Sequence, residues 1–185
     1  MLENIYKETK EKMEKSIHFL IEELKGIRTG KAHPGLVENI QVDYYGSHLP
    51  LKQVASISAP EARLIVIQPW DKNALLPIEK AILSSNLGVN PTNDGKVIRL
   101  NLPQLTEEQR KNLSKLVHKK GEETRVAIRN IRHDVIAHLE KLEEQEHLSE
   151  DDVERGRKEV QKITDEYIKK VDEIIAKKDK EIMEV

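Results

Sequence analysis

The chain has 185 residues, enough for one large domain or two modest ones, and its net charge is only −2. Charged residues make up 35% and aromatic residues 3%, which is typical of long helices with narrow apolar seams. The absence of cysteine excludes disulfides and thiolate metal sites. The N-terminus lacks the apolar core of a signal peptide, and no apolar run reaches membrane-spanning length. We therefore expect a cytoplasmic protein with no membrane association.

Apolar residues in the N-terminal part of the chain follow the three-and-four spacing of a single helix face. The stripe predicts a first helix over about residues 2–28. Its members are Ile5, Thr9, Met13, Ile17, Leu20, Ile21, Leu24 and Ile27.

The middle of the chain changes to a pattern typical of strands and turns. Strands are predicted at residues 40–44, 64–67 and 97–102. A Tyr45-Gly46 turn follows the first strand, and Asn93-Asp-Gly95 looks like a turn before the last. Residues 78–87 look like a short helix ended by Gly88, with Pro77 leaving its start open.

Residues 31–105 are therefore predicted to form a small inserted α/β domain. The chain enters it through residues 29–35 and leaves it through residues 103–106, both at the same end of the helical part. Two short tethers are typical of a hinge. The expected hinge residues are Gly30, Lys31, Pro34, Gly35, Pro103, Gln104 and Leu105.

Two further helices follow the inserted domain. Thr106 and Gln109 are placed to form a capping box at the start of the second helix, which would be about 58 Å long. The run Ser149-Glu-Asp-Asp152 opens the third helix, with Leu148 and Val153 as a hydrophobic staple. Helices joined by so short a connection pack antiparallel, and the first helix completes a bundle.

The expected fold class is thus α+β with two domains. Residues 1–30 and 106–185 form an elongated antiparallel three-helix bundle, and residues 31–105 form the inserted α/β domain.

Catalytic and metal-binding patterns are weak. Gly26–Ala32 is the nearest approach to a phosphate loop, but its spacing is one residue short and Ala32 replaces the magnesium-binding Ser or Thr. The histidines lack zinc-binding spacing, and carboxylate pairs such as Glu143 and Glu144 lie on a polar helix face. We expect no enzyme activity, no catalytic residue, no cofactor and no metal.

The second helix changes the sign of its charge halfway along. Residues 109–133 are strongly basic, whereas residues 134–154 are strongly acidic. Spacings of four and three place three arginines on one helix face, where like charges repel: Arg125, Arg129 and Arg132. Only Glu122 interrupts this line, which is extended by Lys111, Lys115 and His118.

Two interpretations of these arginines stay open. Each could pair with neighbouring helices on a solvated face, which is the simplest account of a single arginine. A polyanion with regularly spaced phosphates would instead offset the repulsion through charge-assisted, often bidentate contacts, and arginine also stacks on exposed RNA bases. We interpret the stripe as an RNA-binding face. The alternative is a three-helix scaffold whose basic face binds an acidic protein partner, with an acid-base hydrolase as a distant third.

Several short runs, in their order along the chain, resemble the bacterial ribosome recycling factor family: Val42-Asp-Tyr-Tyr-Gly46, Leu87-Gly-Val-Asn-Pro91, Asn93-Asp-Gly95 and Ile128-Arg-Asn-Ile-Arg132. Arg28-Thr-Gly30 and the order of helix, inserted domain and two helices agree, so the resemblance covers the whole chain. Val89 stands where the family commonly has Leu, and His133 where it commonly has a second basic residue.

The resemblance implies an L-shaped, monomeric molecule, similar in outline to transfer RNA, that lies across the large-subunit RNA after termination. Elongation factor G, hydrolysing GTP, would push the inserted domain about the hinge so that the subunits part and mRNA and tRNA leave. Carried onto this sequence, the rRNA-contacting role falls on Arg129 and Arg132, with Arg125 nearby and Arg28 as an addition. Lys111 and Lys115 are expected to bind rRNA as well, because they extend the basic stripe. The hinge would be shaped by Gly30, Pro34 and Pro103.

Overall fold

The computed structural model describes residues 1–184, and the chain divides into two compact units. The first unit comprises Met1–Leu24 and Ser114–Asp179. The second comprises Lys25–Leu113 together with the chain from Lys180 onward. The domain boundaries at residues 30 and 106 stay predictions.

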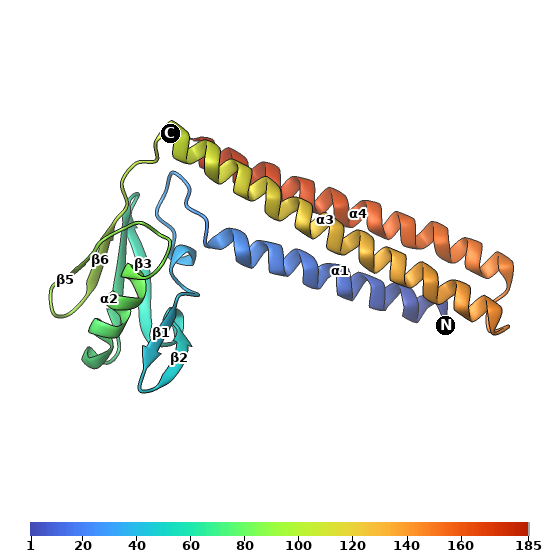
Figure 1. Ribbon diagram of the computed structural model, residues 1–185, viewed down its shortest axis with the longest axis horizontal. Helices are drawn as coiled ribbons and strands as arrows, with labels where there is room; N and C mark the ends of the chain where they lie inside the picture. Colours follow the sequence, from blue (N-terminus) through green and yellow to red (C-terminus); the bar gives the residue numbers. More distant parts are fainter. Residues whose placement is uncertain (185) are drawn as a thin grey trace. The chain divides into compact units, whose positions relative to one another are not determined.

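Most of three long helices forms the first unit: α1 (Leu2–Lys25), α3 (Glu107–Glu144) and α4 (Glu150–Met183), whose remaining end residues belong to the second unit. They lie side by side, with α3 antiparallel to the other two (Figure 1). At 38 residues, α3 is about 57 Å long, as expected from the sequence. The first helix ends at Lys25 instead of near residue 28, because Gly26 is a poor helix former.

The bundle buries a narrow apolar seam. Its best buried side chains are Met13, Leu20, Val117, Ile128, Leu139, Val160, Ile163 and Val171. Ile21 was predicted to belong to the seam, but it is 38% exposed. It lies at the edge of a stripe that is wider than the contact between helices, so the periodicity overestimates the core there.

Local caps begin α3 and α4 where the sequence predicts them. The Gln109 backbone N–H donates to Thr106 Oγ1 at 3.1 Å, and the Thr106 N–H donates to Gln109 Oε1 at 3.0 Å. Asp152 N–H likewise donates to Ser149 Oγ at 3.1 Å, and the Asp152 carboxylate accepts from Ser149 N–H at 3.4 Å. The capping box at Thr106 is therefore confirmed.

The second unit contains a two-stranded sheet formed by β1 (Gln41–Tyr44) and β2 (Ser47–Pro50). Tyr45 and Gly46 connect the strands with φ angles of 48° and 79°. Two successive positive φ values are typical of a tight hairpin turn, and glycine takes the second at no steric cost. The predicted turn is confirmed.

A four-stranded antiparallel sheet has the order β3-β4-β6-β5. Its strands are β3 (Ala55–Glu61), β4 (Leu64–Pro69), β5 (Pro91–Asn93) and β6 (Ile98–Asn101). The sequence predicted β1, β4 and β6 but missed β2, β3 and β5. β2 and β5 are short and carry proline and polar residues, whereas β3 alternates serine with apolar residues that are mostly alanine, which is a weak strand former. Single-turn 3₁₀ helices at Pro34–Leu36, Leu51–Gln53 and Lys72–Ala74 complete the unit.

Helix α2 (Leu75–Leu83) starts and ends earlier than predicted. Pro77 lies in its first turn, where the missing N–H would have had no helical partner. At the other end Ser85 Oγ donates to Ile82 O at 2.6 Å, and Gly88, with φ 69°, lies beyond the helix. The helix packs its apolar face into one core with four sheet residues: Ile65, Ile67, Ile98 and Leu100.

None of the helices in the described part of the chain is long and apolar enough to cross a membrane.

Candidate nucleic-acid interface

The arginine stripe lies on α3, immediately beside the buried seam. Thr124 is 6% exposed and Ile128 fully buried, and Arg125 and Arg129 each follow one of them by a single position. The seam therefore orients the stripe, because burial of the apolar face fixes the rotation of α3 about its axis.

Arg125 is held by carboxylates within the bundle. Its Nε and Nη2 donate to Asp172 Oδ1 of α4 at 2.9 and 2.7 Å, and its Nη1 donates to Glu122 Oε2 at 3.2 Å. Burial alone would lower the pKa of Arg125, but hydrogen bonds to the two carboxylates outweigh it, so the pKa is raised. With only 19% of its side chain exposed, Arg125 fits the first interpretation, an arginine paired with a neighbouring helix.

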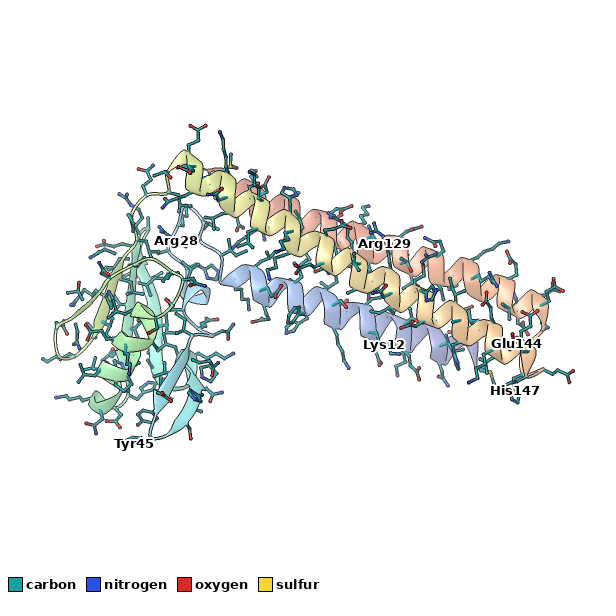
Figure 2. All side chains as sticks on the ribbon, in the orientation of Figure 1. Lys12, Arg28, Tyr45, Arg129, Glu144 and His147 are labelled. Atoms are coloured by element: carbon teal, nitrogen blue, oxygen red, sulfur yellow. The ribbon has the colours of Figure 1, made fainter. Side chains whose placement is uncertain are left out.

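Arg129 and Arg132 make weaker contacts within the bundle than Arg125 does. Arg129 Nη1 lies 3.3 Å from Glu122 Oε1, and its side chain is 52% exposed (Figure 2). Arg132 Nη1 donates to Gln161 Oε1 at 3.1 Å. An exposed ion pair and a contact to a neutral amide are both weak, so phosphate oxygens can replace either partner.

The repulsion along the stripe is thus partly offset inside the protein. Glu122 contacts both Arg125 and Arg129 through its two carboxylate oxygens. The residue that appears in the sequence to interrupt the stripe is an acidic bridge within it.

The predicted lysines differ from one another in their contacts. Lys111 Nζ lies 3.3 Å from Glu107 one turn earlier, with both side chains well exposed. Lys115 is exposed and has no ion-pair partner within residues 1–184. His118 faces α4, where its Nε2 lies 3.6 Å from Asp179 Oδ2. Lys111 and Lys115 therefore keep their charges available at the surface, whereas His118 belongs to a contact between helices.

Arg28 belongs to the second unit, whereas the arginines of the stripe belong to the first. Its Nη2 donates to the carbonyl oxygen of Pro103 at 2.5 Å, and its Nε is buried without a hydrogen-bond partner. Burial lowers the pKa of Arg28. This environment differs from that of Arg129, because the Arg28 guanidinium is directed at the protein's own backbone.

The predicted hinge residues lie in two segments without regular helix or strand, apart from the single turn Pro34–Leu36. One cleft of the second unit is lined by Gly30, Lys31, Gln104 and Leu105, among others. Gly30 is tightly enclosed, since a Cβ there would lie 2.9 Å from the Glu184 carbonyl oxygen. The Gly35 N–H donates to His33 Nδ1 at 2.7 Å.

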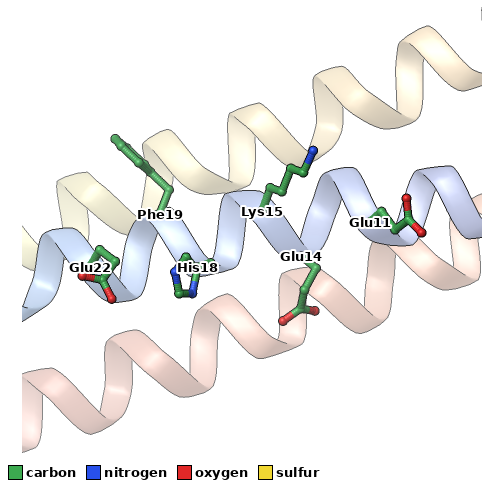
Figure 3. A pocket seen from close by; sticks show the side chains of 6 residues that line it. All are labelled: Glu11, Glu14, Lys15, His18, Phe19 and Glu22. Atoms are coloured by element: carbon green, nitrogen blue, oxygen red, sulfur yellow. The ribbon is translucent and has the colours of Figure 1, made fainter.

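The surface offers little for catalysis. A shallow hollow on α1, shown in Figure 3, is lined by Glu11, Glu14, Lys15, His18, Phe19 and Glu22. Its Glu14 lies 3.7 Å from Lys170 Nζ of α4, as an ordinary surface ion pair. No group of three or more His, Cys, Asp or Glu side chains within residues 1–184 is placed to hold a metal ion.

Sequence reasoning missed the partners that decide how each arginine is used. Asp172 and Gln161 on α4 and the Pro103 carbonyl lie far from their arginines along the chain. No local signal identifies them, because the register between two long helices is a property of the packed bundle.

Comparison with known proteins matches the chain to the family model "Ribosome recycling factor" over residues 20–183. Ribosome-recycling factors of Natranaerobius thermophilus and Alkaliphilus metalliredigens are 52% and 54% identical to it over 181 residues, 98% of either chain. The factor of Halothermothrix orenii is 51% identical over the full length of both chains.

Solved structures agree. The solution structure of a ribosome recycling factor is 47% identical, with a TM-score of 0.78 over 100% of this chain and 98% of that one. The T. thermophilus factor, described with E. coli elongation factor G on the E. coli post-termination complex, is 49% identical, with a TM-score of 0.68 over the whole of both chains. On this evidence the chain belongs to the ribosome recycling factor family.

Proposed function

We propose that this protein recycles ribosomes after translation termination. It binds the post-termination ribosome and, with elongation factor G and GTP hydrolysis by that partner, splits it into subunits and releases mRNA and tRNA. The observation that carries this proposal is the family match over residues 20–183, with relatives about half identical along the full length. The protein is a non-enzymatic factor, and we propose that it acts as a monomer in the cytoplasm.

The α3 stripe is the proposed contact with large-subunit RNA. Arg129 and Arg132 support it, since each has one weak partner within the bundle that phosphate oxygens can replace. Lys111 and Lys115 extend the positive surface toward the start of α3. Arg125 contributes less, because both of its guanidinium edges already meet carboxylates.

The segments around Gly30 and Pro103 are the proposed hinge. Their residues lie outside long helices and strands, so a small number of backbone torsions can absorb a change in direction. Gly30 supports a specific shape for the first segment, because a side chain there would meet the Glu184 backbone.

A splitting assay tests the function. Purified post-termination ribosomes are mixed with the protein, elongation factor G and GTP, and dissociation is followed by light scattering. We expect splitting that requires all three components. Failure of the protein to split ribosomes under conditions where a known recycling factor does so would reject the proposal.

A binding measurement separates RNA recognition from the scaffold alternative. We expect the affinity for isolated large subunits to fall steeply as salt rises, because phosphate contacts release counterions. A scaffold with a basic face would bind any nucleic acid through charge alone, so an excess of bulk competitor RNA would displace it from large subunits, whereas the recycling factor should stay bound.

A further inference from the structure

The two hinge segments are the first linker, residues 26–33, and the second linker, residues 102–106. Both are hydrogen-bonded to the same turn of the second unit. Ala32 N–H donates to the Ala62 carbonyl at 2.6 Å, and Leu102 N–H donates to the Arg63 carbonyl at 2.8 Å. Ala62 and Arg63 are consecutive residues that join β3 to β4. Both linkers therefore meet the unit at neighbouring points on one hairpin.

Arg28 adds a direct connection between the linkers. Its side chain reaches from the first linker to the Pro103 carbonyl of the second, across 75 residues of sequence. The proline ring restricts φ at that position, which reduces the backbone freedom next to the acceptor. With the two backbone hydrogen bonds, this contact closes a loop of three links: first linker to hairpin, hairpin to second linker, and second linker to first.

Part of the Arg28 side chain is buried at this position. Arg28 Nε is buried without a partner and Nη2 is engaged by the Pro103 carbonyl, so neither nitrogen is free to bind a phosphate as a bidentate RNA contact requires. Arg129, which is 52% exposed, meets that requirement. Burying an unsatisfied N–H is unfavourable, so the stem of Arg28 would not be held there unless its end made a needed contact.

We propose that Arg28 is a positioning residue of the hinge: by bracing the first linker against Pro103, it makes the two linkers move as one, and it does not contact ribosomal RNA. This role rests on the proposed function, because two linkers that moved independently would yield to the force from the GTPase partner without transmitting it. Docking, which uses the α3 stripe, does not depend on the brace.

Two substitutions separate the contact from the bulk of the side chain. Arg28→Met keeps the apolar stem but removes every donor, and Arg28→Lys keeps a charge and a single donor group. Arg129→Met makes the same change of residue type on the stripe. It serves as the matched control with the opposite expected behaviour.

The first measurement needs no ribosome. Because the chain has no cysteine, spin labels can be placed on Lys96→Cys of the second unit and Lys162→Cys of the first without background labelling. We expect Arg28→Met to broaden the distribution of distances between the labels, Arg28→Lys to broaden it less, and Arg129→Met to leave it unchanged. An unchanged distribution in Arg28→Met would overturn the brace, whatever the ribosome assays show.

The second measurement compares ribosome binding and splitting. For Arg28→Met we expect splitting to fall about tenfold, the order set by loss of one charge-assisted hydrogen bond. The slope of log affinity for large subunits against log salt should stay at its wild-type value, whereas Arg129→Met should flatten it by about one. A flattened slope in Arg28→Met would show that Arg28 contacts RNA. Inactive wild-type protein would reject the recycling function alone, because the spin-label result still decides the brace.

Discussion

Arg125 on α3 and Asp172 on α4 are joined by two hydrogen bonds, from Nε and Nη2 to a single carboxylate oxygen, at 2.9 and 2.7 Å. The contact lies on the exposed side of the seam and links helices whose residues are 47 positions apart in sequence. It divides the arginine stripe into Arg125, which is used mainly for packing, and Arg129 and Arg132, which make only weak contacts within the bundle.

A double-mutant cycle should detect this coupling. We expect Arg125→Met and Asp172→Asn each to lower the free energy of unfolding and the double variant to lose less than their sum. The interaction energy should be about 1 kcal/mol, the upper end for a partly exposed pair with good geometry. Urea unfolding followed by circular dichroism measures it. Strict additivity would mean that the two groups are independent in solution.

Charge reversal at Arg129 and Arg132 should abolish binding while sparing the fold. Each Glu substitution should change stability by only about 0.5 kcal/mol, because both side chains make weak contacts. Binding to large subunits should fall at least about a hundredfold, since two charge-assisted contacts are lost and repulsion is added. Lysine at both positions should give an intermediate loss, because the charge remains without the planar fork.

The matched control carries the same change of charge elsewhere. Lys7 and Lys10 are exposed residues of α1, on a different helix from the stripe and from its partners Gln161 and Asp172, and reversing both to Glu should leave binding within about twofold, since salt screens charges outside the interface. Thermal melts and ribosome pelleting serve for all variants. If the double Arg-to-Glu protein melts normally and still splits ribosomes at the wild-type rate, the stripe has no role in RNA binding.

The capping box at the start of α3 should contribute measurably to stability. Thr106→Ala leaves the Gln109 N–H without its side-chain acceptor and should lower the free energy of unfolding by about 1 kcal/mol. Gln109→Ala should cost less, because the Thr106 N–H can find water. Gln145→Ala, an exposed change beyond the end of the same helix, is the control. Equal stability of all three variants in urea unfolding would contradict the cap.

The β5–β6 turn should make stability depend on acid. Asp94 accepts hydrogen bonds from Val97 N–H, Arg99 and Lys96 N–H, which hold its pKa well below the usual value. A carboxylate with a depressed folded-state pKa contributes stability that is fully present above its unfolded pKa of about 4 and is lost as pH falls toward the folded value.

Replacing the carboxylate tests that dependence. Asp94→Asn should show a smaller loss of unfolding free energy between about pH 4 and pH 2 than the wild type does. Carbon-detected NMR titration of the Asp94 carboxyl provides the direct measurement. Titration at or above the value of an unfolded aspartate would show that the hydrogen bonds do not persist in solution.

Local features of the fold were predictable. Thr106 with Gln109 and Ser149 with Asp152 mark helix starts, and Tyr45-Gly46 marks a hairpin, because each signal depends on residues a few positions apart. Strands β2, β3 and β5 were missed although each pairs with a strand next to it in the sequence, because their proline, polar and alanine residues give little apolar pattern.

The sequence by itself determined that three long helices and an inserted β-containing segment exist, that a basic stripe lies on one face of α3, and that the chain resembles a known family. Helical periodicity, caps and motifs are properties of neighbouring residues, so they can be read without coordinates. Only the tertiary structure decided which arginine does what. Arg125 donates to Asp172 and Arg28 to the Pro103 carbonyl, because packing brings these distant segments close to them. Arg129 has no such distant partner among the described residues and stays half exposed.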